Sequence, residues 1–139
     1  MSDKFFLDTN IFVYSFESPE QEKRIISEKL IKKAIGGNGS ISFQVIQEFL
    51  NVATRKFAIP LKPEDSKLYI QKVLYPIIEV FPSKELYFSG LEIQQRWKYS
   101  FYDSLILAAA LEAKCNILYS EDLHHNQKVE GLTIINPYL

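Results

Sequence analysis

The feature that most constrains the fold is a repeated alternation of short apolar segments with longer amphipathic ones. We expect strands at 4–7, 40–43, 77–81, 116–120 and 132–137, and helices at 20–35, 44–56, 63–74, 83–98 and 102–114. Several of these strands are apolar on both faces, as strands are when helices cover both sides of a parallel sheet. The alternation therefore predicts an α/β fold with a mainly parallel central sheet.

Composition narrows the class of protein further. The chain has 139 residues and is 47% hydrophobic, which is enough for one compact domain spanning residues 1–139. Its net charge of −1 gives no general attraction to nucleic acid, so any such contact needs a local basic patch. The lone Cys115 forms no internal disulfide, and no apolar run is long enough to span a membrane. We expect a soluble protein of the cytoplasm.

Two aspartates follow expected strands. Asp8 comes after the first strand and Asp122 after the strand at 116–120, with Glu121 as a competing candidate. Ligands of open α/β sheets bind at the carboxyl ends of the strands, so both aspartates are candidates for a site. The alternatives are that Asp8 or Asn10 caps the next helix, and that Asp122 belongs to an ordinary acidic turn.

Two further carboxylates lie on helix faces that are otherwise apolar. Glu48 shares the face of its helix with Val45 and Val52, where a buried ion pair or a position at the edge of the face is the alternative reading. Asp103 begins the buried face of the most apolar helix, but an aspartate in a first turn also suits the helix dipole, and the alternative is that Asp103 caps this helix.

Together these four carboxylates predict a cation site. The carboxyl ends of parallel strands lie on one edge of a sheet, and the following helices begin there. Four carboxylates gathered at this edge repel one another, which raises their pKa values. A divalent cation relieves that repulsion, and ligands that are all oxygen favour Mg²⁺ or Mn²⁺.

The sequence resembles the PIN domains, and most closely the VapC-type toxin ribonucleases of toxin–antitoxin systems. The resemblance covers nearly the whole chain and rests on four segments in order: "FLDTNIFVY", "QVIQEFLNV", "SFYDSLILAAAL" and "LYSEDLHHNQKVEGLTIINPYL". It places the three core acids of the family on Asp8, Glu48 and Asp103, and the fourth acidic position on Asp122. The polar residues expected around these acids are Thr9, Asn10 and Ser120.

The resemblance implies a three-layer α/β/α sandwich and a metal-dependent endoribonuclease that uses Mg²⁺ or Mn²⁺. Asp8 and Asp103 would be the main metal ligands, with Glu48 and Asp122 binding directly or through water. It also implies a homodimer and an antitoxin lying in a groove walled by residues 11–35 and 44–57. Asn126 stands where some relatives carry a further acid or a glycine, which leaves open whether one metal binds or two.

Signals for RNA contact are weaker. Arg55, Arg96 and Lys98 are the candidate phosphate contacts, and the aromatic residues beside the last two could stack bases; these are Trp97, Tyr99 and Tyr102. The alternative is that these aromatic side chains belong to the core or a dimer contact and that the basic ones are simply solvated. His124 and His125 have no further His or Cys cluster with which to complete a zinc site.

Two other functions are compatible with parts of this pattern. A metal-dependent phosphatase would use Asp8 as its nucleophile, but such sites usually carry a second aspartate two residues on, where this chain has Asn10. A PIN-fold interaction module would keep the fold without cleavage, although the four intact acids argue against it.

Overall fold

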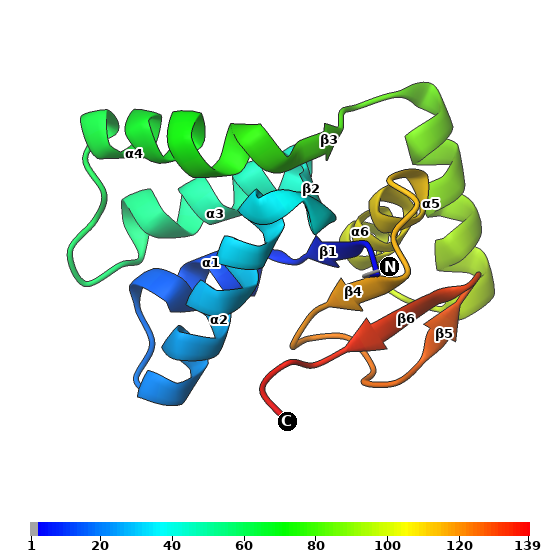
Figure 1. Cartoon of the computed structure of the whole chain (residues 1–139). Helices are drawn as coiled ribbons and strands as arrows, with labels where there is room; N and C mark the ends of the chain where they lie inside the picture. The colour runs from blue at the N-terminus through cyan, green and yellow to red at the C-terminus, as the bar shows by residue number, and fades with distance from the viewer. Residues whose placement is uncertain (1–2) are drawn as a thin grey trace.

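The computed structural model describes residues 3–139 and contains one six-stranded sheet (Figure 1). The strands run in the spatial order β3 (Ile78–Val80), β2 (Gly39–Ser42), β1 (Phe5–Leu7), β4 (Ile117–Tyr119), β6 (Leu132–Ile135) and β5 (Lys128–Val129). All neighbouring strands pair in parallel except β5, which pairs antiparallel with β6. The predicted α/β class with a mainly parallel sheet is confirmed.

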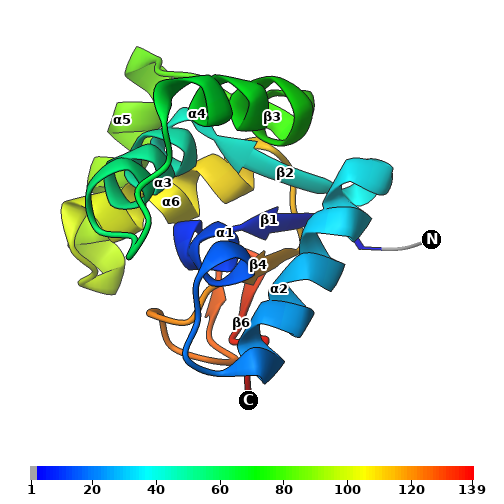
Figure 2. The ribbon, with the colours of Figure 1, turned by 90° about the vertical axis from the view of Figure 1, so that its left-hand side faces the viewer.

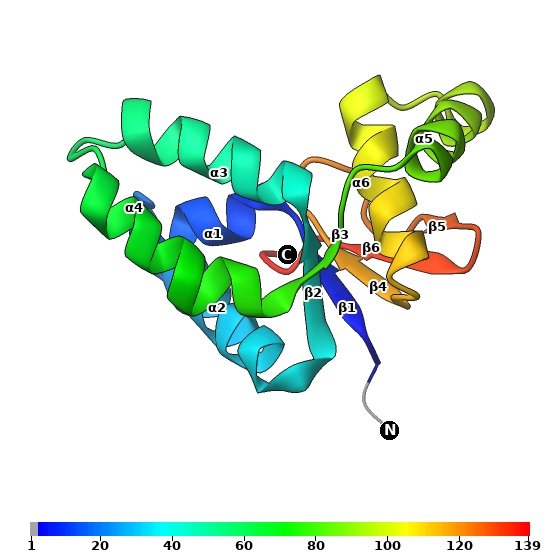
Figure 3. The same ribbon diagram turned by 90° about the horizontal axis from the view of Figure 1, so that it is seen from above.

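Helices cover both faces of the sheet, which gives the predicted three-layer arrangement (Figures 2 and 3). On one side lie α1 (Thr9–Phe16), α2 (Gln21–Lys33), α3 (Phe43–Arg55) and α4 (Pro63–Tyr69). On the other side α5 (Lys84–Trp97) packs against α6 (Phe101–Glu112). Three short turns complete the chain: the π-helical η1 (Ala34–Asn38) and η2 (Ile70–Leu74) and the 3₁₀ turn η3 (Tyr75–Ile77).

The centre of the core is β1, which is covered on both faces. Phe6 and Leu7 are completely buried, and Phe5 packs edge-on against Tyr119 of β4. From β1 the chain winds outward through β2 and β3, and then crosses to the other side of β1 to form β4. The carboxyl ends of β1 and β4 therefore meet at the point where the winding direction reverses, which is where open α/β sheets bind ligands.

Three features differ from the sequence prediction. No helix was expected at 9–16, yet α1 forms there and packs against α2 and α3. The two-residue strand β5 was also missed, since it is held by pairing with β6 and has no apolar run of its own. Ile25, an apolar residue of the helix expected at 20–35, is 42% exposed, although the apolar face of an amphipathic helix is usually buried. Within residues 3–139 no helix is long and apolar enough to cross a membrane.

Candidate active site

Asp8 lies directly after β1 and serves as the N-cap of α1. Its Oδ1 accepts a hydrogen bond from the backbone N–H of Thr9 at 2.7 Å, and its Oδ2 accepts one from the Ser120 hydroxyl at 2.8 Å. The side chain is buried, with Ser120 reaching it from the end of β4. The alternative reading of Asp8 as a helix cap is thus confirmed, and the same residue is buried at the carboxyl end of β1.

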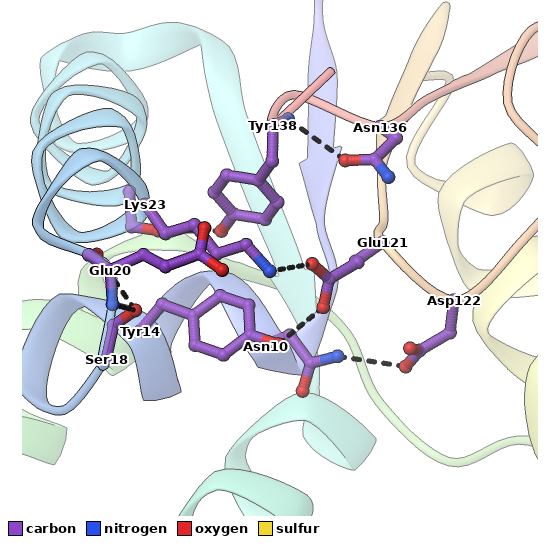
Figure 4. A network of polar contacts seen from close by, with 10 residues as sticks. Asn10, Tyr14, Ser18, Glu20, Lys23, Glu121, Asp122, Asn136 and Tyr138 are labelled. Carbon is purple, nitrogen blue, oxygen red and sulfur yellow. Dashed lines mark hydrogen bonds and ion pairs between the residues drawn. The ribbon is translucent and has the colours of Figure 1, made fainter.

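The segment after β4 carries both competing acids, and they face different partners (Figure 4). Asp122 accepts a hydrogen bond from the Asn10 amide at 2.9 Å. Glu121 instead turns toward α1 and α2, where it accepts hydrogen bonds from Tyr14 and, at 2.5 Å, from Lys23. Glu121 is therefore neutralised by a lysine, and Asp122 is the acid of this pair that points toward the Asp8 side of the sheet edge.

Glu48, on α3, is half-buried and held by two neutral donors. The Thr9 hydroxyl donates to Oε1 at 2.6 Å, and the Gln44 amide donates to Oε2 at 3.0 Å. The ion pair that was the alternative reading of Glu48 does not form with any residue in 3–139. Gln44 was not singled out from the sequence, although its spacing of four residues from Glu48 on one helix is the signal that could have found it.

Asp103 lies in the first turn of α6 and is half-buried. The N-cap of this helix is Ser100, whose hydroxyl accepts a hydrogen bond from the backbone N–H of Asp103 at 3.2 Å. Asp103 is therefore not the capping residue that the alternative reading required. The negative charge of Asp103 raises the pKa of Asp122, which indicates that these two carboxylates lie close enough to repel.

Asp8, Glu48 and Asp122 accept hydrogen bonds from neutral donors, and none of the four candidate acids has a basic partner among residues 3–139. None of the ion pairs within residues 3–139 includes Asp8, Glu48, Asp103 or Asp122. Burial raises the pKa of Asp8 to about 6 against the hydrogen bonds from Ser120 and Thr9, and the negative charges of Glu48 and Asp122 add to the increase. Burial and the charge of Glu121 raise the pKa of Asp122. The site is thus electrostatically unfavourable to the ionised forms of Asp8 and Asp122.

This donor set fits a hard divalent cation in its chemistry, because it offers carboxylate oxygens with no competing cation nearby. As the side chains now stand, no three His, Cys, Asp or Glu side chains in residues 3–139 converge closely enough to hold an ion. The oxygens of Asp8, Glu48 and Asp122 are instead engaged by Thr9, Asn10, Gln44 and Ser120.

The candidate RNA contacts are spread over two regions. Arg55 is exposed at the end of α3, whereas Arg96 at the end of α5 pairs with Glu130 at 2.7 Å and Lys98 follows it in the left-handed conformation. Among the aromatic candidates, Tyr102 is 66% exposed beside Asp103. Trp97 and Tyr99 are half-buried, and the Tyr99 hydroxyl donates to Gln127.

The loop at 124–127 forms a tight turn. Asn126 adopts a φ of 69°, a left-handed conformation that asparagine tolerates, and its backbone N–H bonds to the carbonyl of Ile134 at 2.7 Å. His125 accepts a hydrogen bond from the backbone N–H of Asn136 at 2.9 Å.

Solved structures with this architecture come from toxin–antitoxin systems. A toxin–antitoxin complex from Klebsiella pneumoniae aligns with a TM-score of 0.67 and 18% identity over 97% of this chain and 98% of that chain. VapBC2 from Rickettsia felis, bound to a DNA fragment from its promoter, aligns with a TM-score of 0.62 and 16% identity over 94% of this chain and 96% of that chain. VapC20 of Mycobacterium tuberculosis, described as a toxin that cleaves the sarcin–ricin loop, aligns with a TM-score of 0.61 and 16% identity over 86% of this chain and 90% of that chain.

No curated protein sequence matches this chain. The sequence profile of the PIN domain, in contrast, matches residues 5–130, a span that runs from β1 to the turn before β6 and includes every candidate acid. The profile and the toxin structures agree on one fold, and the chain belongs to the PIN domain family.

Proposed function

We propose that this chain is a single-domain, metal-dependent endoribonuclease of the cytoplasm, acting as the toxin of a type II toxin–antitoxin pair. The observation that carries the proposal is the set of four carboxylates at one sheet edge, contributed by the ends of β1 and β4 and by α3 and α6. No lysine or arginine of residues 3–139 neutralises them. Asp8 is buried without a counter-ion from the described residues, and the three more exposed acids have none either. A buried, unpaired carboxylate costs stability, so its presence favours a role in binding a cation.

The proposed cation is Mg²⁺ or Mn²⁺, held by Asp8, Asp103, Glu48 and Asp122. Bound there, it would lower the pKa of a water molecule and offset the charge of the RNA phosphate. The surrounding residues keep the carboxylates in place: Ser120 and the Thr9 backbone hold Asp8, the Thr9 hydroxyl holds Glu48, and Asn10 holds Asp122.

Cleavage of total cellular RNA by the purified, antitoxin-free chain tests the proposal. We expect internal cleavage with Mg²⁺ or Mn²⁺ and none with EDTA. Asp8→Asn and Asp103→Asn are each expected to lose at least about a hundredfold in rate, since each removes a proposed ligand. Glu92→Gln, an exposed change on α5, is the matched control and should keep wild-type activity. Cleavage that survives in the Asp8→Asn, Asp103→Asn double variant would contradict the mechanism.

The proposed antitoxin contact is an apolar surface at the carboxyl ends of α1 and α3. A hollow of about 490 Å³ runs from the end of α1 across the segment 57–61, and a second of about 260 Å³ continues it along α4. Phe16, Ile59 and Leu68 expose 41%, 85% and 53% of their surfaces there. Of the predicted groove walls, 11–35 and 44–57, only 16–19 and Phe57 line these hollows, and the segment 58–61 and α4 supply most of the rest.

Asp substitutions at Ile59 and Leu68 test this contact. We expect them to weaken the complex with a co-expressed antitoxin while RNA cleavage by the free toxin stays unchanged. Unaltered binding by both variants would contradict the placement.

We also propose RNA contacts by exposed basic residues and a homodimer through α5. Arg55 and Lys98 are exposed and available to phosphates, whereas Arg96 would have to leave Glu130.

The exposed Phe88 and Leu91 on α5 offer apolar surface for a second copy of the chain. Sedimentation of the antitoxin-free chain at micromolar concentration tests the dimer, with a monomer as the contradicting result.

A further inference from the structure

Gln44 is a buried polar residue between two of the elements that carry the candidate acids. It lies in the first turn of α3 and is only 3% exposed, although glutamine is usually found on the surface. Its amide nitrogen donates to Glu48 Oε2 at 3.0 Å and to the backbone carbonyl of Tyr102 at 3.1 Å. One side chain thus joins α3 to the first turn of α6.

The orientation of this amide is determined by its partners. Both neighbours are acceptors, a carboxylate and a carbonyl, so only the NH₂ end of the amide can face them. The two hydrogens of that group match the two acceptors. The other end, Oε1, is buried and accepts no hydrogen bond from the residues that the structure describes.

The unpaired Oε1 atom reduces what Gln44 can contribute to the stability of the fold. A buried acceptor without a donor costs stability, which offsets much of what the two donated bonds contribute. An apolar side chain of similar length would fill the same space without this cost. Gln44 therefore has little to offer as a stabilising residue, and its contacts point to the placement of the acids.

We propose that Gln44 is a positioning residue that fixes the Glu48 carboxylate relative to the turn of α6 bearing Asp103. Thr9 holds the other oxygen of Glu48, at 2.6 Å, so the two donors together prevent the carboxylate from rotating. The Tyr102 carbonyl immediately precedes Asp103 in the chain, and the bond to it sets the distance between α3 and α6 at the site. This inference rests on the proposed nuclease function.

The experiment compares Gln44→Met and Gln44→Asn with wild type. Methionine keeps the length without donors, and asparagine keeps the amide but is too short to span both acceptors. Gln47→Met is the matched control, because Gln47 is exposed on the same helix. For each protein, cleavage is measured against Mn²⁺ concentration and against RNA concentration, and thermal unfolding is measured without metal.

We expect both Gln44 variants to need about 10- to 100-fold more Mn²⁺ for half-maximal cleavage, the usual effect of losing a group that orients a metal ligand. The KM for RNA should stay close to wild type in both variants. The melting temperature should stay close to wild type in Gln44→Met and fall in Gln44→Asn, whose shorter amide is buried without both partners. Gln47→Met should change neither the Mn²⁺ dependence nor the melting temperature.

Three outcomes would overturn the inference. Unchanged Mn²⁺ dependence in both Gln44 variants would remove the positioning role alone. Failure of both variants to fold would make Gln44 a structural residue. Absence of metal-dependent cleavage in wild type would defeat the proposed function, and this inference with it.

Discussion

At the scale of single residues, Asp8 is the clearest case of stability given up at the site. Its pKa of about 6, against an ordinary 3.8, means that the folded protein holds an ionised carboxylate at neutral pH at a cost. A shift of this size corresponds to about 3 kcal/mol. Two hydrogen bonds already favour the ionised form, so the cost remains after they are counted.

Asp8→Asn is therefore expected to stabilise the metal-free protein at neutral pH. Because the folded-state pKa is raised, the contribution of Asp8 to stability is present below pH 3.8 and is lost as the pH rises through about 6. The variant has no such loss. Its free energy of unfolding should therefore exceed that of wild type by about 1–3 kcal/mol at pH 7 and by much less at pH 4. Urea unfolding at both pH values measures this, with Glu92→Gln as the control. A variant less stable than wild type at pH 7 would contradict it.

The sequence identified these acids because a carboxylate among apolar residues is conspicuous, but it could not identify all the residues around them. Asp8 satisfies the pattern for a helix cap and for a buried carboxylate equally well, so the pattern alone could not separate the two. Gln44 was missed for the opposite reason. A neutral side chain on a helix gives no sign of burial until its neighbours in space, Glu48 and Tyr102, are known.

At the scale of secondary-structure elements, α1 shows where sequence patterns fail. Its sequence, "TNIFVYSF", is rich in aromatic and β-branched residues, which have low helix propensity. The helix forms because Ile11 and Phe12 are completely buried, with Phe12 against Phe49 of α3. Packing against distant elements thus overrides local preference, and this information is absent from any short window of the sequence.

The start of β2 is constrained by close packing, and Gly39→Ala is expected to destabilise the fold. A Cβ at this position would lie 2.5 Å from the Cα of Ala34 and 2.9 Å from the ring of Phe5, its partner in register on β1. Overpacking of this kind costs about 1–3 kcal/mol. Urea unfolding measures the loss.

Gly36→Ala is the matched control for this change. A Cβ there meets no atom within 4 Å, so we expect stability equal to or slightly above wild type. Equal stabilities for the two variants would show that β2 adjusts to the added methyl group.

The segment after β4 is held to α1 and α2, and Lys23→Met is expected to loosen it. Lys23 pairs with Glu121 at 2.5 Å and lies over the rings of Tyr14 and Tyr138 at 4.9 and 5.4 Å (Figure 4). Without the ammonium group, Glu121 keeps only the bond from Tyr14. Amides 120–126 should then exchange hydrogen faster, whereas Lys29→Met, exposed on the same helix, should leave them unchanged. Equal exchange in the two variants would contradict this anchoring role.

At the scale of the whole molecule, the winding of the chain brings together residues that are far apart in sequence. Asp8 and Ser120 are separated by 112 positions, yet they form a hydrogen bond because β1 and β4 are parallel neighbours. Parallel strand order could be anticipated from the alternation of strands and helices, and so could the edge on which the acids lie. The hydrogen-bond partner of each carboxylate oxygen could not be predicted from the sequence, because it depends on strand register and on side-chain rotamers.

The last prediction concerns pH and metal together. Metal binding requires ionised Asp8, whereas the metal-free fold favours its protonated form below pH 6. Raising the pH from 5 to 7 should therefore reduce the contribution of Asp8 to the stability of the metal-free protein. The same change should strengthen Mn²⁺ binding. The increase in melting temperature caused by saturating Mn²⁺ should grow across this interval, because stabilisation by a ligand follows its affinity. Asp8→Asn should show a small increase that does not vary with pH. An increase in wild type that stays constant between pH 5 and 7 would separate Asp8 from the metal site.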